Sequence, residues 1–258
     1  MEPHPPQAPA LPPVEDLLAR LDRQRLPRHI AVIMDGNGRW AEQRSLPRLA
    51  GHEAGAESVR AVIEACGELH IEALTLYTFS AENWARPAHE VSGLMRLIDR
   101  TLRRELPELH QKGVRIRAIG CLGELPDFVQ QTLADARGLT ADNPGLHLNL
   151  AINYGGRVEI VDAARALAAA VAAGQMRQDD ISEQTFAARL YDPEMPDPDL
   201  LIRTAGEMRV SNYLLWQIAY AEIVVVPTLW PDFRRPHLLQ CLVEYQGRTR
   251  TFGRVLDL

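Results

Sequence analysis

Short apolar runs alternate along this chain with longer stretches in which apolar residues recur every three or four positions. The runs are typical of buried strands, and the longer stretches have the spacing of amphipathic helices. Strands are expected at residues 30–34, 71–80, 114–120, 146–154, 200–203 and 222–227, and helices at 51–69, 90–109, 127–139 and after 157. This alternation predicts a single α/β domain with a central, mostly parallel sheet flanked by helices.

The first 24 residues differ from the rest of the chain. Six prolines stand between residues 3 and 13, and proline removes a backbone donor and breaks both helix and sheet. Residues 1–24 are therefore predicted to be a Pro-rich, largely disordered lead that ends in a small helix around Leu17, Leu18 and Leu21. The domain itself is expected at residues 25–258.

Composition limits the classes of function. The chain has 258 residues, of which 46% are hydrophobic and 24% charged, and no stretch resembles a membrane span or a secretory signal, which predicts a cytoplasmic protein. A net charge of −6 argues against a nucleic-acid partner, so local arginines must meet any anionic ligand. Cys66, Cys121 and Cys241 lie too far apart to suggest a disulfide framework or a zinc site.

The apolar run at residues 30–34 is followed directly by a loop of small, acidic, basic and aromatic residues: Asp35, Gly36, Asn37, Gly38, Arg39 and Trp40. Gly36 and Gly38 let backbone N–H groups approach anionic oxygens, and Arg39 offers a planar fork of donors, which together predict a phosphate loop. Asp35 has two interpretations. A carboxylate beside phosphates either holds Mg²⁺ or caps the turn through its own backbone.

Two further strand ends carry polar and cationic residues. The strand at 71–80 leads into a loop that contains Ser80, Glu82, Asn83, Trp84 and Arg86. The strand that ends at Arg203 leads to Glu207, Arg209 and Ser211, where a helix is expected to begin. Two arginines and a hydroxyl at such a place predict a second diphosphate site. Parallel sheets bind ligands beyond the carboxyl ends of their strands, so the loops are expected to share one edge.

Two other residues, His52 and Glu222, each leave two interpretations open. Arg48 and His52 stand at the start of the predicted helix at 51–69, where the helix terminus adds partial positive charge to theirs. His52 is either an anion ligand or only a satisfied residue of the helix start. Glu222 begins the last strand, where a buried carboxylate requires a metal or a cationic partner such as Arg203 or Arg209.

Six motifs in this order and spacing resemble the cis-prenyltransferases, of the bacterial undecaprenyl diphosphate synthase type: MDGNGRW (34–40), GHEAG (51–55), YTFSAENWARP (77–87), NYGGR (153–157), IRTAGE (202–207) and SNYLLWQIAYAE (211–222). The resemblance runs from about residue 25 to the C-terminus. It implies a Mg²⁺-dependent transferase that condenses an allylic diphosphate, typically farnesyl diphosphate, with successive isopentenyl diphosphates in Z configuration. A long-chain product would be a lipid carrier precursor for cell-wall synthesis. The resemblance further implies a hydrophobic tunnel, a homodimer, and transient contact with the inner membrane surface as product leaves.

The resemblance also implies residue roles. Asp35 would be the Mg²⁺-associated carboxylate, Glu222 a second metal ligand, and Asn83 the proton acceptor, although a diphosphate oxygen or Asp35 is a better base than an amide. The implied substrate-binding residues are Gly36, Asn37, Gly38, Arg39, Arg48, His52 and Arg86 around the allylic diphosphate, Trp40 and Trp84 beside the reacting chain, Ser80 and Glu82 in the adjoining loop, and Arg203, Arg209 and Ser211 at the isopentenyl diphosphate. Leu146 would close the tunnel floor.

The chain departs from the family pattern at two positions. Ala205 replaces a glycine, and Met208 stands where the bacterial pattern often has a histidine, so a metal site built on that histidine loses a ligand. A short- or medium-chain Z-prenyl synthase shares every motif and is the main alternative. A noncatalytic prenyltransferase-like subunit would be expected to lack the phosphate-binding residues. A phosphatase with Asp35 as nucleophile would carry a second acid where Asn37 stands.

Overall fold

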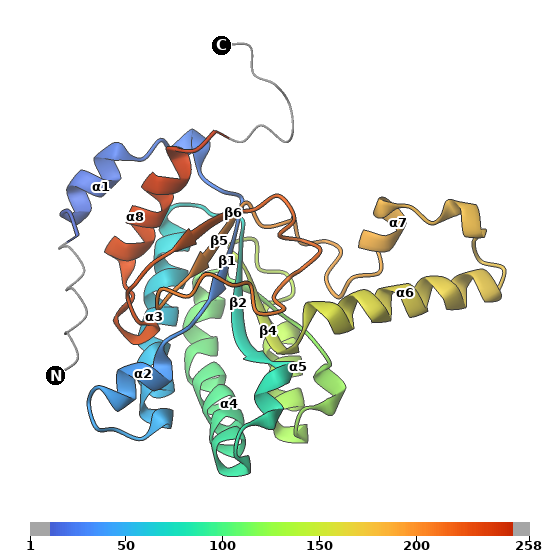
Figure 1. Ribbon diagram of the computed structural model, residues 1–258, viewed down its shortest axis with the longest axis horizontal. Coiled ribbons are helices and arrows are strands. Elements are labelled where there is room, and N and C mark those ends of the chain that lie inside the picture. Colours follow the sequence, from blue (N-terminus) through green and yellow to red (C-terminus); the bar gives the residue numbers. More distant parts are fainter. Residues whose placement is uncertain (1–10, 250–258) are drawn as a thin grey trace.

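Six strands form one all-parallel sheet, in the order β3-β4-β2-β1-β5-β6 (Figure 1). The structure is a computed structural model and describes residues 11–249. Its strands are β1 (His29–Ile33), β2 (Ala73–Ser80), β3 (Arg115–Ile119), β4 (His147–Tyr154), β5 (Leu200–Arg203) and β6 (Glu222–Val225). The sequence predicts a mostly parallel sheet, and the described strands confirm that prediction and extend it to every pair.

Helices lie in most connections between the strands, as well as before β1 and after β6. They are α1 (Val14–Arg20), α2 (Asn37–Glu42), α3 (Arg48–Glu68), α4 (Ala88–Gln111), α5 (Asp127–Thr140), α6 (Gly156–Ala172), α7 (Glu183–Ala187) and α8 (Arg235–Gln246), with short 3₁₀ turns η1 (Arg23–Arg25), η2 (Ala81–Ala85), η3 (Leu122–Glu124), η4 (Gln178–Asp180) and η5 (Trp230–Asp232). The helices predicted from apolar periodicity are therefore α3, α4, α5 and α6.

The helix predicted to begin near Ser211 is absent, and residues 204–221 form turns instead. Ser211, Asn212 and Leu214 have φ angles of 46°, 61° and 44°. Residues with left-handed backbone conformations cannot continue a right-handed helix. The apolar residues of this segment therefore pack against the sheet from a loop and do not form one face of a helix. This segment follows β5 and carries the predicted second diphosphate site.

Two apolar cores lie on opposite faces of the sheet. Ile30 and Val32 of β1 face the larger core, together with residues of α1, α3, α4, α5 and α8. Ala31 and Ile33 face a smaller core that includes Tyr213 from the segment after β5. Successive side chains of a strand point to opposite faces, so β1 is buried on both sides, as its uninterrupted apolar run predicts.

The connections after β1 and β5 leave the sheet toward opposite faces. Helix α3 follows β1 and packs into the larger core, whereas Tyr213 and Leu214 follow β5 and pack into the smaller one. Where neighbouring parallel strands send their connections to opposite sides, a crevice opens beyond their carboxyl ends. Asp35 and Arg203 stand at the ends of these two neighbouring strands. The topology therefore brings the two predicted phosphate loops together.

The N-terminal segment is described in part. Residues 1–10 of the predicted Pro-rich lead lie outside the described residues. The small helix predicted around Leu17 is α1, which packs on α8 with the Leu17 side chain fully buried. The proposed division of the chain at residue 24 stays a prediction. No helix between residues 11 and 249 is long and apolar enough to cross a membrane.

Gly51 sets the close approach of α3 to α2. A Cβ atom at Gly51 would overlap the carbonyl oxygen of Asn37 in the first turn of α2. We expect Gly51→Ala to lower the free energy of unfolding by about 1 to 3 kcal/mol, because backbone atoms must move to admit the methyl group. Urea unfolding followed by circular dichroism measures this change.

Gly67→Ala is the matched control, because a Cβ atom at Gly67 in the same helix would meet no atom within 4 Å. Alanine has a higher helix propensity than glycine, so this variant should be neutral or more stable by up to about 1 kcal/mol. Equal free energies of unfolding for the two variants would contradict the close-packing argument.

Candidate active site

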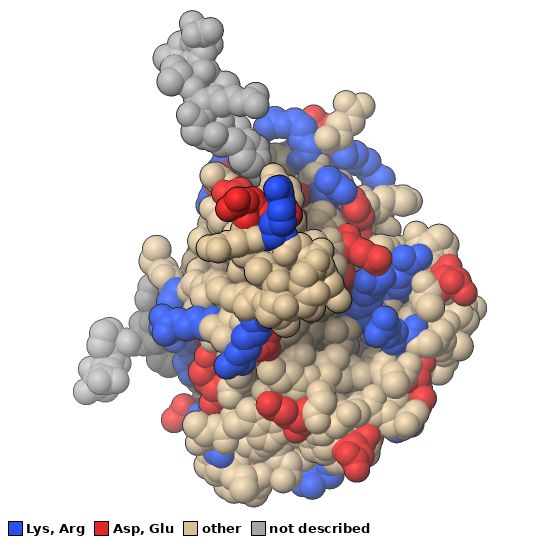
Figure 2. Space-filling model, turned by 90° about the vertical axis from the view of Figure 1, so that its right-hand side faces the viewer, with Lys and Arg blue, Asp and Glu red and all other residues tan. Residues whose placement is uncertain are grey.

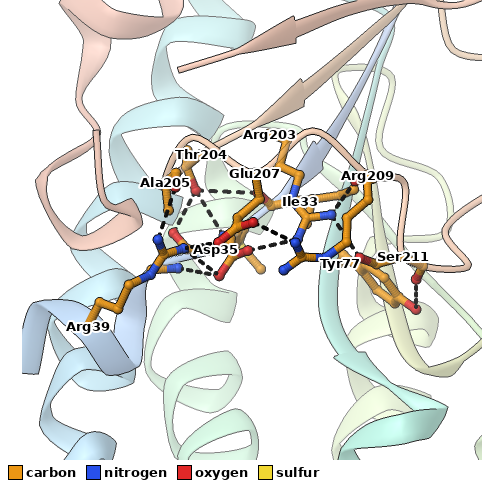
Figure 3. Close-up of polar contacts among 12 residues, drawn as sticks. Ile33, Asp35, Arg39, Tyr77, Arg203, Thr204, Ala205, Glu207, Arg209 and Ser211 are labelled. Carbon is orange, nitrogen blue, oxygen red and sulfur yellow. Dashed lines mark hydrogen bonds and ion pairs between the residues drawn. The ribbon is translucent and has the colours of Figure 1, made fainter. Parts of the chain in front are cut away.

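A buried salt bridge joins the ends of β1 and β5 (Figure 3). Arg203 Nη2 lies 2.8 Å from Asp35 Oδ2, and Arg203 is only 3% exposed. A guanidinium so deeply buried requires partners for its donors. Its Nη1 donates to Ser211 Oγ at 2.8 Å and to the carbonyl oxygen of Arg209. The salt bridge therefore fixes the loop after β1 against the segment after β5.

The Asp35 carboxylate has several partners at once. Its Oδ1 accepts a hydrogen bond from the N–H of Gly36 at 2.7 Å and lies 3.6 Å from Arg39 Nη2. The Thr204 hydroxyl accepts from Asp35 N–H at 2.8 Å and donates to the Asp35 carbonyl oxygen at 2.7 Å. Asp35 thus caps the turn, as one interpretation of the sequence predicts. Its side chain also keeps 28% exposure, so a ligand can reach it.

Glu207 is a site residue to which the sequence assigned no role. Its Oε1 lies 3.3 Å from Arg39 Nη2, and its Oε2 accepts a charge-assisted hydrogen bond from Arg209 Nη1 at 2.5 Å (Figure 3). Arg39 Nη1 also donates to the carbonyl oxygen of Ala205 at 3.1 Å. Glu207 therefore links Arg39 with Arg209, as Asp35 links Arg39 with Arg203. Its place at the end of the IRTAGE motif, two residues before Arg209, is the signal that could identify it.

A second charged group lies where α3 and α4 begin. The Glu90 side chain, 10% exposed, pairs with Arg86 at 3.0 Å and lies 3.7 Å from Arg48 Nε. A Cβ atom on Gly38 would come within 2.8 Å of Arg48 Nη2, so this glycine lets Arg48 approach the loop after β1. Glu90 was also unassigned, although its position four residues after Arg86 at a helix start is typical of an ion pair.

The two groups together carry excess positive charge. Their ion pairs join five arginines to three carboxylates, an excess of two positive charges: Arg39, Arg48, Arg86, Arg203 and Arg209 with Asp35, Glu90 and Glu207. Such a cluster attracts anions and can meet diphosphate oxygens with charge-assisted hydrogen bonds. A bound diphosphate would compete with the carboxylates for these donors.

An elongated cavity of about 220 Å³ begins beside this cluster and runs between α3, α4 and the sheet. Asn37, His52, Asn83 and Arg86 line its polar end. Apolar side chains line its middle: Leu76, Leu94, Leu97, Ile98, Leu102, Leu148 and Leu150. A polar mouth followed by apolar walls suits a ligand with an anionic head and a hydrocarbon tail.

Most polar groups of the loop after β2 already have hydrogen-bond partners, some within the loop and some in neighbouring segments. Asn83 Oδ1 accepts from Ser80 N–H at 3.2 Å, and Glu82 accepts from a side-chain amide of the segment after β5 at 2.7 Å. Trp84 Nε1 donates to Asn153 Oδ1 at 2.8 Å. Asn83 lines the cavity together with the nearby Arg86, whereas Ser80, Glu82 and Trp84 do not.

Trp40 and Leu146 also lie outside the cavity lining. Trp40 Nε1 donates to Asp232 Oδ1 at 2.8 Å, and the Arg44 guanidinium lies over its ring at 4.1 Å from the centroid. Leu146 is buried immediately before β4. Side chains two residues apart on a strand share a face, so Leu146 lies on the same face as Leu148, one step farther along the sheet.

Glu222 is not brought to Asp35. Glu222 is the first residue of β6, and the strand register places it beside the first residues of β5 and β1. It therefore lies where the strands begin, whereas Asp35 lies beyond the end of β1. Parallel strands all begin at one side of the sheet and end at the opposite side, so a small movement of side chains cannot bring the two carboxylates together. Its cationic partner is Arg248, at 3.0 Å, and not Arg203 or Arg209 as the sequence suggested. Within one copy of residues 11–249, the register keeps Glu222 away from Asp35, and the role of Glu222 as a second metal ligand stays a prediction.

The two departures from the family pattern lie in the segment after β5, where Ala205 is buried and Met208 is exposed. Ala205 has a φ of 67°, a left-handed conformation that glycine adopts more readily. Met208 is 89% exposed and contributes nothing to the ion pairs around Glu207. Met208 therefore adds no metal ligand, and the carboxylates beside Arg39 are those of Asp35 and Glu207.

His52 lies at the polar end of the cavity. Burial, together with the guanidinium groups of Arg86 and Arg48, lowers the pKa of His52 from its ordinary value of 6.5 to about 4. The imidazole is therefore neutral at pH 7 in the free protein and offers one donor and one acceptor. A diphosphate bound beside it would favour the protonated form and raise this pKa.

We expect His52 to titrate near pH 4 in the free protein and at higher pH with inorganic diphosphate bound. The lowered native pKa means that the unfolded state takes up the proton first as pH falls. The free energy of unfolding therefore decreases between about pH 6.5 and about pH 4. An NMR titration, assigned with His52→Gln, measures the pKa. A value near 6.5 in the free protein would contradict the assigned burial.

Comparison with known proteins identifies the family. Residues 33–253 match the family described as "Putative undecaprenyl diphosphate synthase". The chain is 54% identical over 239 residues to the isoprenyl transferase of Heliobacterium mobile, and the aligned region covers 93% of this chain and 92% of that relative. It is 48% identical over 239 residues to the isoprenyl transferase of Bacillus subtilis strain 168, with 93% and 90% covered.

A solved structure agrees with the sequence relatives. Lavandulyl diphosphate synthase from Lavandula x intermedia, in complex with dimethylallyl diphosphate, superposes with a TM-score of 0.86 at 40% identity, covering 89% of this chain and 99% of that one. These matches confirm the family that the six motifs predict. The chain belongs to the undecaprenyl diphosphate synthase family of cis-prenyltransferases and is an isoprenyl transferase.

Proposed function

We propose that this isoprenyl transferase condenses farnesyl diphosphate, or a related allylic diphosphate, with successive isopentenyl diphosphates to make a long-chain Z-polyprenyl diphosphate such as undecaprenyl diphosphate. The observation that carries this proposal is the arrangement of arginines on both sides of Asp35, next to an apolar cavity. The dimethylallyl diphosphate bound to the lavandulyl relative supports an allylic substrate.

The arginines divide into two proposed binding groups. Asn37 and Arg86 line the cavity, and Arg48 lies beside Arg86 through their shared partner Glu90. Arg48 and Arg86, together with the backbone N–H groups of residues 37–39, would hold the allylic diphosphate with its tail in the cavity. Arg203, Arg209 and Ser211 would hold the isopentenyl diphosphate. Arg39 contacts both Asp35 and Glu207 and lies between the groups. Separate groups of donors would hold two repelling anions close together.

The proposed chemistry is an alkyl transfer. The bond between allylic C1 and its diphosphate oxygen breaks, and the isopentenyl double bond supplies the electron pair of the new C–C bond. A proton then leaves C2 of the isopentenyl unit, which gives a Z double bond and free diphosphate. Arg48 and Arg86 would stabilise charge on the leaving diphosphate. Asn83 Oδ1 already accepts from Ser80 N–H, so we favour a diphosphate oxygen or Asp35 as proton acceptor.

We propose Mg²⁺ as the cofactor and Asp35 as its protein ligand. Residues 11–249 contain no group of three or more His, Cys, Asp or Glu side chains that could hold a metal. Mg²⁺ commonly takes one or two carboxylates together with substrate phosphates. Asp35, with Glu207 on the other side of Arg39, fits that requirement. When bound, the ion would supply positive charge to the leaving diphosphate.

We propose a long product, with Leu146 as part of the wall at the far end of the tunnel. Each added isoprene unit brings five carbons, and burial of each contributes about 0.8 kcal/mol, so every cycle deepens binding by roughly 4 kcal/mol while apolar space remains. Elongation would then stop at a wall or at an opening. A short- or medium-chain Z-prenyl synthase remains the alternative, and chain-length analysis of the products separates the two.

We propose a homodimer that works in the cytoplasm, in transient contact with the inner membrane surface. Val158 and Val161 of α6 are 37% and 46% exposed, and Ile223 of the edge strand β6 is 43% exposed. Figure 2 views the side from which α6 and α7 project, and uncharged residues occupy the middle of this face. Exposed apolar side chains and an uncovered strand edge favour association. Sedimentation distinguishes a dimer from a 28.8 kDa monomer, which would contradict this proposal.

The proposed function is tested by incubation with farnesyl diphosphate, labelled isopentenyl diphosphate and Mg²⁺, with wild type compared with Asp35→Asn. Wild type should yield long Z-products. Asp35→Asn keeps the size of the side chain, and we expect turnover to fall by roughly a hundredfold or more, because a neutral amide is a weaker Mg²⁺ ligand than a carboxylate. Affinity for farnesyl diphosphate should be equal or tighter, since a negative charge has gone.

Asp99→Asn is the control, because the Asp99 side chain is 23% exposed, close to the 28% of Asp35, and pairs with Arg103 at 2.8 Å without lining the cavity. It should keep near wild-type turnover. Near-normal turnover of Asp35→Asn would leave Asp35 with only its turn-capping role. Failure of wild type to elongate farnesyl diphosphate would overturn the proposed function.

A further inference from the structure

A small polar cavity lies on the opposite face of the sheet from the elongated cavity. Asn149 of β4 and Thr75 of β2 line it, and the strand register places them side by side. Ile119 and Leu214 of the smaller core line it too, whereas Leu148, the neighbour of Asn149 along β4, packs in the larger core. Its volume of about 20 Å³ exceeds the roughly 10 to 15 Å³ that one water molecule requires, so it has room for a single water or a small ion.

Three residues that line this cavity each have a buried side-chain oxygen without a hydrogen-bond partner among the described residues: Asn149 Oδ1, Asp192 Oδ2 and Gln217 Oε1. Within residues 11–249 only one other buried side-chain oxygen lacks a partner, Asn37 Oδ1 in the elongated cavity. Asn149 is 2% exposed, and the Asp192 side chain is 6% exposed. Buried oxygens normally have a donor or a cation beside them, so three of them around one small space indicate a bound species.

The donors around the cavity already have partners. Gln217 Nε2 donates to Glu159 Oε2 at 3.0 Å, which fixes the orientation of the amide and leaves Oε1 without a partner. Burial lowers the pKa of His29 to about 4, so its ring is neutral at pH 7. The His29 Nδ1 donates to the Pro196 carbonyl oxygen at 2.5 Å, and its Nε2 accepts from the Thr75 hydroxyl at 2.7 Å. The three oxygens therefore require a partner that is not a side chain of this lining.

Negative charge exceeds positive charge around the cavity. Glu159 lines it, is 1% exposed and forms no salt bridge with any residue between 11 and 249. Its carboxylate accepts hydrogen bonds from Tyr154 O–H at 2.5 Å and from Tyr191 N–H at 2.9 Å. Asp192 Oδ1 pairs with Arg117 at 2.9 Å. Two carboxylates thus have one guanidinium between them, and a buried negative charge remains without a cationic partner.

One water molecule cannot satisfy this arrangement. It donates two hydrogen bonds, one fewer than the three oxygens require, and it brings no charge. A monovalent alkali cation binds several carboxylate and amide oxygens at once and would offset the unpaired charge. Mg²⁺ usually keeps several water ligands, for which a cavity of about 20 Å³ has no room. We propose that Asn149, Asp192 and Gln217 bind one monovalent alkali cation, Na⁺ or K⁺, in this cavity.

The ion would connect parts of the chain on both sides of β5. Asp192 precedes this strand, Gln217 follows it, and Asn149 lies in β4. The segment that contains Gln217 also carries Arg209 and Ser211. A bound cation would therefore stabilise the segment of the proposed isopentenyl diphosphate group without contacting substrate. Its test needs no substrate, so its outcome is independent of the proposed elongation.

The test is thermal unfolding of the full chain in NaCl, in KCl and in N-methyl-D-glucamine chloride at equal ionic strength, since this organic cation is too large for the cavity. For wild type we expect Na⁺ or K⁺ to raise Tm in a saturable way, by about 3 to 5 °C at ten times the dissociation constant. Equal Tm values in the three salts would overturn the inference.

Two variants place the effect at the cavity. Asn149→Leu removes one oxygen and nearly keeps the side-chain size, and we expect it to lose the cation-dependent rise in Tm. In N-methyl-D-glucamine chloride its Tm should equal or exceed that of wild type, because an unpaired buried oxygen has gone. Asp192→Asn removes a charge, and we expect the cation dissociation constant, measured from the dependence of Tm on salt concentration, to rise at least tenfold. Wild-type behaviour of both variants would contradict the site.

Asn143→Leu is the matched control. Asn143 is also buried, at 9% exposure, but its Nδ2 donates to the Val114 carbonyl oxygen at 2.7 Å and it does not line this cavity. It should lower Tm equally in all three salts and keep the cation-dependent rise. Loss of the rise in this variant would show a general response of a weakened fold to salt. A crystal structure from NaCl or KCl with one water in the cavity, hydrogen-bonded to only two of the oxygens, would also overturn the inference.

Discussion

The buried guanidinium of Arg203 is the constraint on which the rest of the site depends. At 3% exposure it needs a carboxylate, and Asp35 supplies one at 2.8 Å across the boundary between β1 and β5. Removing one partner of a buried pair typically costs about 3 to 5 kcal/mol, because the remaining charge is left uncompensated. Its other contacts, to Ser211 Oγ and to the Arg209 carbonyl, hold the segment after β5 in its turns. One charge therefore fixes both phosphate loops.

The remaining charges are arranged around that fixed pair. Glu207 and Glu90 hold the more exposed arginines in place while no substrate is bound. A preorganised set of donors loses little freedom when a diphosphate replaces a carboxylate, which suits a site that must bind charged substrates repeatedly. Arg48 begins α3, Arg86 stands two residues before α4, and both helices continue along the cavity. One pair of helices would therefore position both the head group and the hydrocarbon of the proposed substrate.

Most of the fold was predictable because the strands β1, β4 and β5 are buried on both faces and the helices show clear periodicity. The phosphate loops were predictable because glycine and arginine follow strand ends directly. The partner of Glu222 could not be predicted, because its pairing with Arg248 depends on the register of β6 and on the position of the residues that follow α8. The helix predicted near Ser211 is absent because residues 211, 212 and 214 have left-handed backbone conformations. The residue types at these positions do not by themselves indicate such a conformation. The place of Arg60 in the cavity lining depends on tertiary packing, which no local sequence pattern shows.

The most direct test of this account is whether two separate arginine groups hold the two diphosphates. Arg48 and Arg209 suit the comparison, because their side chains are similarly exposed, at 60% and 62%. Dissociation constants for each substrate alone should show that Arg209→Ala weakens isopentenyl diphosphate by roughly ten- to a hundredfold, the loss of one charge-assisted hydrogen bond, with little effect on farnesyl diphosphate. Arg48→Ala should do the reverse. Equal weakening of both substrates by either variant would contradict the division of the site.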